Sequence, residues 1–528
     1  VTIAFGDFPF VSGLNRSGGM ESAWGPVEML FTPTEDGSVI AGPMLAKSYQ
    51  MAPDLSRVTI QLQQGVQFHK GYGEMTAEDV VWSLNDANGA VTPTSIHPQA
   101  GDLAKFGPAK VLGKYEMEIP FTAYDVSWNA NRSNTAGLAW GVVSKAAYDK
   151  NGEEWTRNNI IGTGSYQVLE WLAANRAVLE AVPNHWRKTA KAPTLRFVSV
   201  PEASTRLAML RTGEADVIPT VFKDMKATLD EGFKTAGAGG GIKASFIFSG
   251  NYWEKVDPRT GQPLPVIGVT YDPNLPWMVP LVSVGDEKKM ERARKVRWAM
   301  TMAIDRELIN KTVLNGLGWA EYEHFVSVKQ PQWQAKWAVP YDPAGAEKLL
   351  DEAGYPKKDG VRFDVSIFIQ VPAIPAEIAD AVGGFLDKVG IRTTVDKSAY
   401  AIGRPSMVGR TWTKPFIRYA SEAVPQRPFD WPKGDEMSFL GRGGFGPGIE
   451  IPKITETLLA VGKEPDIEKR IRMNVELVDY VHQWMITSAI VTWPTSLTYN
   501  PKSIASWPMK TYFPTLDMAY PEYMVLAR

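Results

Sequence analysis

The sequence predicts an α/β protein, mainly from one passage in which a strand, a helix and a second strand follow one another. Residues 363–369 and 391–395 have the composition of strands. Between them, apolar residues recur at helical spacing from Ile378 to Val389, and Gly390 supplies a stop. A strand, a helix and a strand in this order predict parallel pairing within an α/β lobe.

The length and the composition are those of a soluble protein with several domains. At roughly 150 residues per domain, the 528 residues predict about three domains. The 56 basic and 58 acidic residues give a net charge of -2, so no overall field attracts nucleic acid or an anionic membrane. No stretch approaches the ~20 apolar residues that span a bilayer.

Cysteine is absent, which excludes a disulfide scaffold, a thiolate zinc site, an iron–sulfur cluster and a cysteine nucleophile. A long chain without cysteine suits an oxidising compartment. The chain opens with a strand-like stretch at residues 1–5, without an initiator Met or a charged and apolar leader. We therefore expect a processed, mature start.

The first third of the chain predicts a small α+β unit. A turn cluster at 32–37 is followed by alternating apolar and polar residues at 57–62, which predict a half-buried strand. Thr76 and the acids after it predict the start of a helix whose apolar face is 80–84. Together these elements predict one small unit over 36–156.

A strand-rich passage and a glycine-rich crossing follow. Residues 162–166 open the passage, and 177–182 predict a strand. A short helix is predicted from Ser204 to Arg211, closed by Gly213. The glycines at 237–241 predict a flexible crossing between lobes.

Beyond the crossing, apolar residues recur every four positions from Val296 to Leu308 and predict a single helix. Asp305 and Arg306 then fall one turn inside this helix, where we expect ion pairing.

The usual catalytic signatures are absent. No HExxH or GxSxG motif occurs, and the stretch from Gly107 to Lys114 departs from a phosphate loop in the spacing of its glycines and in the Tyr115 that follows it. The glycines at 441–448 lack the strand-to-helix context of a dinucleotide site and predict a surface loop. A triad assembled from distant residues remains open, but nothing points to an enzyme or to a cofactor. The histidines lack ligand-like spacing and predict no metal site; they are His69, His97, His185, His324 and His482.

Several segments, in order along the chain, resemble the extracytoplasmic solute-binding proteins of peptide-type ABC importers, the group of oligopeptide, dipeptide and nickel binders. These segments are 45–49 with 64–71 and 76–84, then 162–166, 183–186, 210–216, 296–297 with 303–307, and 341–343 with 346, 348–350 and 352–355. Their own physical roles are structural. Gly65 and Gly71 suit turns, Thr76 caps a helix, and Asp342–Pro343 begins one.

The resemblance implies a bilobal periplasmic-binding-protein fold, with two α/β lobes joined by a hinge and an extra small α+β domain. We expect lobe I at 1–35, 157–245 and 490–528, the small domain at 36–156 and lobe II at 246–489. It also implies a periplasmic protein, or a lipid-anchored one in a Gram-positive organism, that acts as a monomer. The lobes of such proteins close over a solute, which a membrane permease then accepts.

The same resemblance places ligand contacts in the loop after the first strand, in the lobe crossing and in a late segment that corresponds here to 418–431. In peptide binders an acid of the late segment holds the amino terminus of the peptide, so Glu422 and Asp430 are candidates. The aspartate-rich pattern of that segment is absent, as is the Asn-plus-Tyr pattern downstream, at 439–445. The alternative is a solvated loop whose acids pair with Arg418 or Arg427.

Tryptophan, at 18 residues, supplies candidate walls for a ligand. The segment 250–286 is longer than the resemblance predicts. The ligand stays open between a short peptide and an oligosaccharide, opine-like or aromatic compound; a nickel complex or haem, a chemosensory relay and a cleft hydrolase are further alternatives. The predicted ligand-binding residues are Met20, Glu21, Trp24, Trp253, Trp277, Trp412, Tyr419, Glu422, Arg427, Phe429, Asp430 and Trp431.

Overall fold

The computed structural model describes most of the chain. The described residues are 1–6, 12–17, 25–32, 42–97, 100–104, 106–122, 124–126, 128–129, 141–172, 175–236, 241–258, 261–264, 274–371, 374–420, 429–432, 448–494, 497–507 and 521–527. Within these ranges, no helix combines the length and the apolar character needed to cross a membrane.

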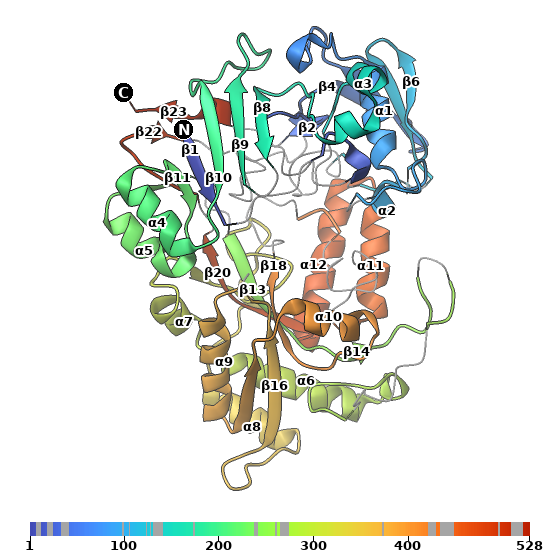
Figure 1. The fold of residues 1–528 in the computed structure, drawn as a ribbon. Helices are drawn as coiled ribbons and strands as arrows, with labels where there is room; N and C mark the ends of the chain where they lie inside the picture. The colour runs from blue at the N-terminus through green and yellow to red at the C-terminus, as the bar shows by residue number, and fades with distance from the viewer. Residues whose placement is uncertain are drawn as a thin grey trace. The chain divides into compact units, whose positions relative to one another are not determined.

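The chain divides into two compact units (Figure 1). Unit 1 comprises Val1–Gly240 and Thr495–Arg528, and unit 2 is the continuous segment Gly241–Pro494. Each unit contains both helices and sheets, as the predicted α/β class requires. The predicted division at 36, 156, 246 and 489 stays a prediction.

A seven-stranded mixed sheet forms the centre of unit 1, with the order β12-β21-β11-β1-β10-β9-β8. Strand β1 runs parallel to β10 and β11, and the other pairings are antiparallel. The strand from the carboxyl-terminal part of the chain, β21, lies between β11 and β12. The strands are β1 (Thr2–Phe5), β8 (Tyr166–Leu172), β9 (Arg176–Ala181), β10 (Thr194–Ser199), β11 (Val217–Pro219), β12 (Lys234–Ala236) and β21 (Leu497–Tyr499).

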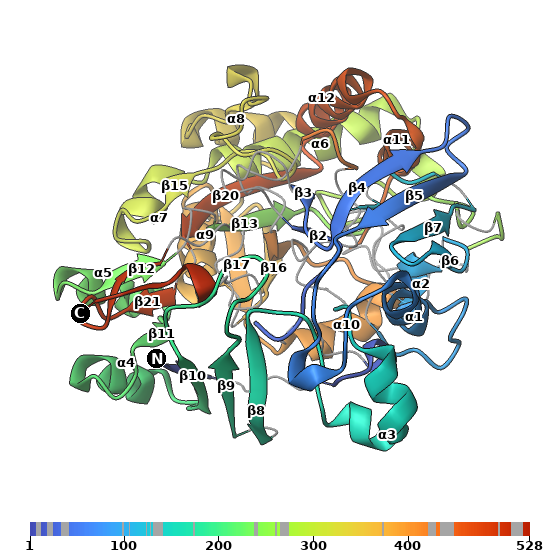
Figure 2. The same cartoon turned by 90° about the horizontal axis from the view of Figure 1, so that it is seen from above.

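A second, antiparallel sheet of unit 1 has the order β4-β5-β7-β6 (Figure 2). The predicted strand at 57–62 is confirmed as β5. The predicted helix after Thr76 is also confirmed, because Asp79 accepts a hydrogen bond from the Thr76 backbone N–H at 2.9 Å. The elements are β4 (Ala46–Met51), β5 (Arg57–Leu62), β6 (Lys110–Gly113), β7 (Glu116–Pro120), α1 (Ala77–Ala87), α2 (Ala100–Leu103) and α3 (Lys145–Arg157).

Shorter elements complete unit 1. The helix predicted over 204–211 is α4 (Ala203–Thr212), and Gly213 ends it in a left-handed conformation with φ 82°. The remaining elements are α5 (Phe222–Asp230), β2 (Phe31–Thr32), β3 (Gly42–Pro43), β22 (Ile504–Ser506) and β23 (Val525–Leu526).

The main sheet of unit 2 has the order β15-β20-β13-β18-β16-β17. The predicted strand–helix–strand passage is confirmed as β16, α9 and β17, and β16 pairs in parallel with both β17 and β18. Strand β13 runs antiparallel to β18 and β20. The elements are β13 (Gly241–Ile247), β15 (Trp319–Ala320), β16 (Phe363–Ile369), α9 (Ala376–Lys388), β17 (Ile391–Asp396), β18 (Phe416–Ala420) and β20 (Thr487–Pro494).

The helices of unit 2 include two adjacent pairs, α6 with α8 and α11 with α12 (Figure 1). A short parallel pair, β14 and β19, lies outside the main sheet. The elements are α6 (Glu287–Met302), α7 (Arg306–Thr312), α8 (Pro343–Glu352), α10 (Tyr400–Val408), α11 (Pro452–Lys463), α12 (Ile467–Trp484), β14 (Asn251–Tyr252) and β19 (Ile449–Glu450).

The prediction of one helix from Val296 to Leu308 is wrong. Helix α6 ends at Met302, and Asp305 is the N-cap of α7, where its carboxylate accepts from the Leu308 backbone N–H at 2.9 Å. The apolar spacing continues across the break, but an Asp that bonds the backbone ahead of it starts a new helix. The N-terminal Asp342–Pro343 of α8 is confirmed as a cap followed by Pro in the first turn.

Candidate functional site

The carboxyl ends of the parallel strands in unit 2 define a candidate binding edge. Strand β18 overhangs β16: its register with β16 ends at Ile417, whereas its register with β13 continues to Ala420 opposite Lys243. Among the described strands, β13 is the one that pairs with Tyr419 and Ala420. In open α/β sheets, ligands bind outside the carboxyl ends of the strands, so this edge is where a ligand is expected.

Two buried polar atoms near this edge have no hydrogen-bond partner among the described residues. They are Oε1 of Gln370, which follows β16, and Oγ of Ser245, which lies opposite Arg418 in the β13–β18 register. Buried polar atoms are nearly always satisfied in folded proteins, so unsatisfied ones call for an explanation. A bound ligand with polar groups would provide one.

Three of the predicted tryptophans are packed inside unit 2. The indole N–H of Trp253 donates to the Val279 carbonyl at 2.8 Å, and that of Trp277 donates to the Ser249 carbonyl at 3.1 Å. Trp412 packs edge-on against Phe368 with ring centroids 5.1 Å apart. The indole nitrogen of Trp412 is buried without a partner in the described part of the chain, unlike those of the other two.

The predicted residues of the late segment lie in two places. Tyr419 is half-buried on β18, at the candidate edge. Residues 429–431 are instead attached to α12, because Asn474 donates to the carbonyls of both Phe429 and Trp431 at 2.7 Å.

The carboxylate of Asp430 is already paired. Arg470 of α12 donates to it at 2.6 Å and also bonds the Asp430 carbonyl. The sequence interpretation considered Arg418 and Arg427 as partners for this acid and missed Arg470, which lies 40 residues further on. Five other predicted residues lie outside the described ranges: Met20, Glu21, Trp24, Glu422 and Arg427.

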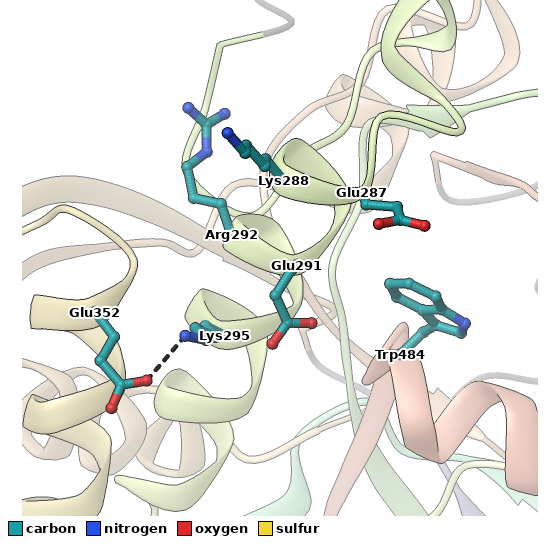
Figure 3. Close-up of a pocket in the computed structure, with 7 residues that line it drawn as sticks. All are labelled: Glu287, Lys288, Glu291, Arg292, Lys295, Glu352 and Trp484. Atoms are coloured by element: carbon teal, nitrogen blue, oxygen red, sulfur yellow. Dashed lines mark hydrogen bonds and ion pairs between the residues drawn. The ribbon is translucent and has the colours of Figure 1, made fainter.

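A pocket in unit 2 lies between α6, α8 and the end of α12, and Figure 3 shows the residues that line it. It encloses about 550 Å³ and is lined by Glu287, Lys288, Glu291, Arg292, Lys295, Glu352 and Trp484. The sequence interpretation named none of these residues. Elsewhere in the described ranges, no group of three or more His, Asp or Glu side chains is arranged to hold a metal ion.

The profile of bacterial extracellular solute-binding proteins, family 5, matches residues 41–414, which is more than half of the chain. This chain belongs to that family. The family prediction made from the sequence segments is thus confirmed.

Curated relatives are similar over part of their length. The glutathione-binding protein GsiB of Pectobacterium atrosepticum is 26% identical over 59% of this chain and 53% of its own. The dipeptide-binding protein of Escherichia coli is 25% identical over 67% of this chain and 62% of its own. The matches thus span little more than half of these relatives.

A solved structure supports the predicted bilobal fold. HbpA2 from Haemophilus parasuis has a TM-score of 0.75 at 17% identity, covering 100% of both chains. At this identity the likeness shows the fold alone, and the predicted fold class is confirmed.

Two of the family segments in unit 1, 162–166 and 183–186, meet around a buried carboxylate, Glu28. Its oxygens accept from Thr163, Trp186 and Arg187, the last at 2.5 Å. Arg187 also donates to Glu522 at 2.6 Å. We call these five residues the Glu28 cluster; it joins segments that are remote in the sequence.

Two histidines support the neighbouring segment 162–166. His69 bonds the Gly164 carbonyl and His185 bonds the Thr163 carbonyl, each at 2.9 Å. Burial lowers the pKa of His69 to about 4, with the nearby His185 and Lys70 adding to the effect and the bond to Gly164 opposing it. His69 is therefore neutral at pH 7 and acts as a hydrogen-bonding partner of the Gly164 carbonyl.

A second buried cluster lies near β13 and β20, which are the first and the last strand of unit 2. The ammonium of Lys243 is fully buried and donates to the carbonyls of Glu323 and Val326 at 2.5 and 2.8 Å. The carboxylate of Glu321 is 3.5 Å away. We call these residues, with His482, the Lys243 cluster.

The acids of the Lys243 cluster are held mainly by neutral donors. Glu321 accepts from the side chains of Trp319 and Ser327 at 2.6 and 2.5 Å. Burial raises the pKa of Glu323, while its contact with His482 acts in the opposite direction. The sequence interpretation missed both clusters; a charged residue inside an apolar run, as at Glu28 and Lys243, is the signal that could have indicated them.

Proposed function

We propose that this protein captures a short peptide, or another small organic solute, outside the cytoplasm and delivers it to an ABC permease. The proposed location is the periplasm, or the outer face of the membrane if the protein is lipid-anchored, and the proposed working form is a monomer. Capture and release break no bond, so the proposal assigns no catalytic residue.

The observation that carries the peptide proposal is the overhang of β18. Tyr419 and Ala420 pair with β13 and lie beyond the last residue of β18 that is in register with β16. An extended peptide can add to such a strand through main-chain hydrogen bonds, which are independent of its side chains. The names of two family members, a dipeptide-binding and a glutathione-binding protein, agree with this ligand class.

The predicted ligand residues are proposed to contribute unequally. Tyr419 lies at the edge itself and is the described aromatic side chain best placed to contact a ligand. The indole N–H groups of Trp253 and Trp277 donate to backbone carbonyls and are not available to a ligand. We therefore propose that these two residues support the site from within unit 2. Because Arg470 pairs with Asp430, we propose Glu422 as the anchor for a peptide amine.

The second candidate is a non-peptide ligand such as an oligosaccharide, an opine-like or an aromatic compound. The pairing of Asp430 with Arg470 favours it, because it removes one of the two candidate carboxylates for an amine. The unsatisfied indole nitrogen of Trp412 and Oε1 of Gln370 would suit a ligand rich in hydroxyl or carboxylate groups.

The experiment that tests the proposal is mass spectrometry of the purified protein under native and denaturing conditions. A bound peptide, or a mixture of peptides, is the expected result. A sugar or an aromatic acid would replace the first candidate by the second, and chemical turnover of the released compound would contradict a role in binding alone. If no compound co-purifies, a thermal-shift panel of di- to pentapeptides against sugars and aromatic acids decides between the candidates.

Variants then assign the anchor by calorimetry with the identified peptide. Glu422→Gln should weaken binding by about tenfold or more, because a lost charged contact costs roughly 1.5–3 kcal/mol. Asp430→Asn should leave affinity unchanged, because its carboxylate is engaged by Arg470. Equal affinities in the Glu422 variant and the parent would contradict the anchor assignment.

A further inference from the structure

Two buried carboxylates of unit 2, those of Glu254 and Glu450, lie close to one arginine. Glu254 follows β14 and is 8% exposed, and Glu450 is the last residue of β19 and is 3% exposed. The two strands pair in parallel, and the Trp253 backbone N–H donates to the Glu450 carbonyl at 2.8 Å. Two acidic residues are therefore buried at the end of one short strand pair.

The guanidinium of Arg410 forms its ion pair with Glu450. Its Nε donates to the two oxygens of Glu450 at 2.8 and 3.1 Å, and its Nη2 donates to Oε2 at 2.8 Å. Its contact with Glu254 is instead to the backbone, because Nη2 lies 3.4 Å from the Glu254 carbonyl oxygen. Oε1 of Glu254 is buried and has no hydrogen-bond partner in the described part of the chain. Buried polar atoms are nearly always satisfied, so this oxygen calls for an explanation.

The groups that act on the charge of Glu254 come from three neighbouring elements. Burial raises the pKa of Glu254, and the negative charges of Glu450 on β19 and Glu456 on α11 raise it further. The hydroxyl of Thr455, also on α11, and the guanidinium of Arg410, which follows α10, act in the opposite direction. We call these five residues the Glu254 cluster.

The segment that carries Glu254 also holds the backbone of Trp412. The hydroxyl of Tyr252 donates to the Trp412 carbonyl at 2.8 Å and accepts from the Trp412 backbone N–H at 3.0 Å. The guanidinium carbon of Arg410 lies 5.7 Å from the centroid of the Tyr252 ring. Glu254 and Trp412 are thus connected through contacts of Arg410 and Tyr252.

We infer that the Glu254 cluster is a proton switch, in which Glu254 takes up one proton from the solvent as the pH falls and thereby tightens the packing of β14 and β19. Protonation leaves one charged carboxylate, Glu450, for Arg410 and turns the unsatisfied acceptor into a neutral acid. Because folding raises the pKa of Glu254 above its model value of 4.5, the folded state binds this proton more tightly than the unfolded chain. The stability gained is fully present below pH 4.5 and is lost as the pH rises through the raised pKa.

The test compares the parent with Glu254→Gln in urea unfolding of the full chain between pH 4.5 and pH 8. Glutamine has the shape of the protonated acid and does not ionise. At pH 8 the variant should therefore have a higher urea midpoint than the parent, and the gap should narrow as the pH falls. The unfolding equilibrium constants should diverge about tenfold for each unit by which the pKa is raised. A variant that is less stable at pH 8, or a gap that is independent of pH, overturns the switch.

A second variant, Glu456→Gln, keeps Glu254 and removes one of the negative charges that act on it. Glu456 is exposed, so the substitution leaves the interior unchanged. It should raise the urea midpoint at pH 8, by less than Glu254→Gln does, and should have no such effect when residue 254 is already glutamine. An equal effect in both backgrounds overturns the coupling. The matched control is Glu476→Gln, which removes an exposed acid of α12 and should leave the pH dependence unchanged.

Hydrogen exchange distinguishes a switch from a group that acts on overall stability alone. The amide of Trp253, bonded to the Glu450 carbonyl, and the amide of Trp412, bonded to the Tyr252 hydroxyl, report on the two sides of the cluster. Both amides should exchange more slowly in Glu254→Gln than in the parent at pH 8, whereas amides of unit 1 should exchange alike in the two proteins. Equal exchange of Trp253 and Trp412 in both proteins overturns the tightening.

Discussion

The two units bury charged groups in opposite ways. In the Glu28 cluster of unit 1, one guanidinium, Arg187, lies between two carboxylates, Glu28 and Glu522. In the Lys243 cluster of unit 2, the cation is held largely by backbone carbonyls, and Glu321 is satisfied by neutral donors. The comparison teaches that removing one cation should leave two buried carboxylates without it in unit 1, and one buried carboxylate together with unsatisfied carbonyls in unit 2.

The largest expected effect is that of Arg187→Met. The substitution leaves Glu28 and Glu522, both 1% exposed, without their shared cation. Loss of one partner from a buried ion pair costs about 3–5 kcal/mol, so the free energy of unfolding by urea should fall by that amount. The control is Arg176→Met, which breaks an exposed pair with Glu170 and should cost less than about 1 kcal/mol. Similar losses in both variants would contradict the role of the Glu28 cluster.

A pH-dependent loss of stability of up to about 3 kcal/mol is expected from His69, which supports the same cluster. Its pKa is lowered from 6.5 to about 4 in the folded state, so the unfolded chain binds the proton first as the pH falls. The stability that the fold gains by keeping His69 neutral is therefore fully present above pH 6.5 and is lost progressively as the pH falls towards 4. His69→Gln keeps a donor for the Gly164 carbonyl and cannot titrate. Urea unfolding of both proteins at several pH values should show a shallower pH dependence for the variant; parallel curves would refute the assignment.

A smaller loss, of about 2 kcal/mol, is expected for Lys243→Met. The substitution leaves the carbonyls of Glu323 and Val326 without this donor and takes the ammonium away from Glu321, which keeps its bonds to Trp319 and Ser327. The measurement is again urea unfolding, compared directly with Arg187→Met. If the Lys243 variant proved the less stable of the two, the distinction between paired charges and carbonyl-held charge would be wrong.

Local signals made much of the fold predictable. The strand–helix–strand passage around α9, the capping acid Asp79 and the terminating Gly213 each act through neighbours in the sequence. The break between α6 and α7 was not predicted, because the apolar period runs through it and Asp305 acts as a cap only in the folded backbone.

The candidate site was less predictable, because its contacts join distant residues. The partner of Asp430 comes from α12, and the strand end at Tyr419 pairs with β13 beyond the last residue in register with β16. A single sequence does not reveal which of several arginines pairs with a given acid, or where one strand extends beyond the end of its neighbour. The family resemblance indicated the region of the chain where a ligand is proposed to bind, and the three-dimensional pairing shows which partners Tyr419 and Asp430 have in it.

The position of β21 between β11 and β12 has a consequence for synthesis. Unit 2 is one continuous segment and can fold as soon as residue 494 has been made, whereas unit 1 lacks an inner strand until residues 497–499 follow. Until then β11 and β12 remain unjoined, although most of unit 1 was made first. Pairing between the two ends of a chain is slow, because the entropy of closing a long loop is lost before the new contacts can stabilise the pair. A chain truncated before residue 497 should therefore keep a native unit 2 and an incomplete unit 1, a natural target for proteolysis.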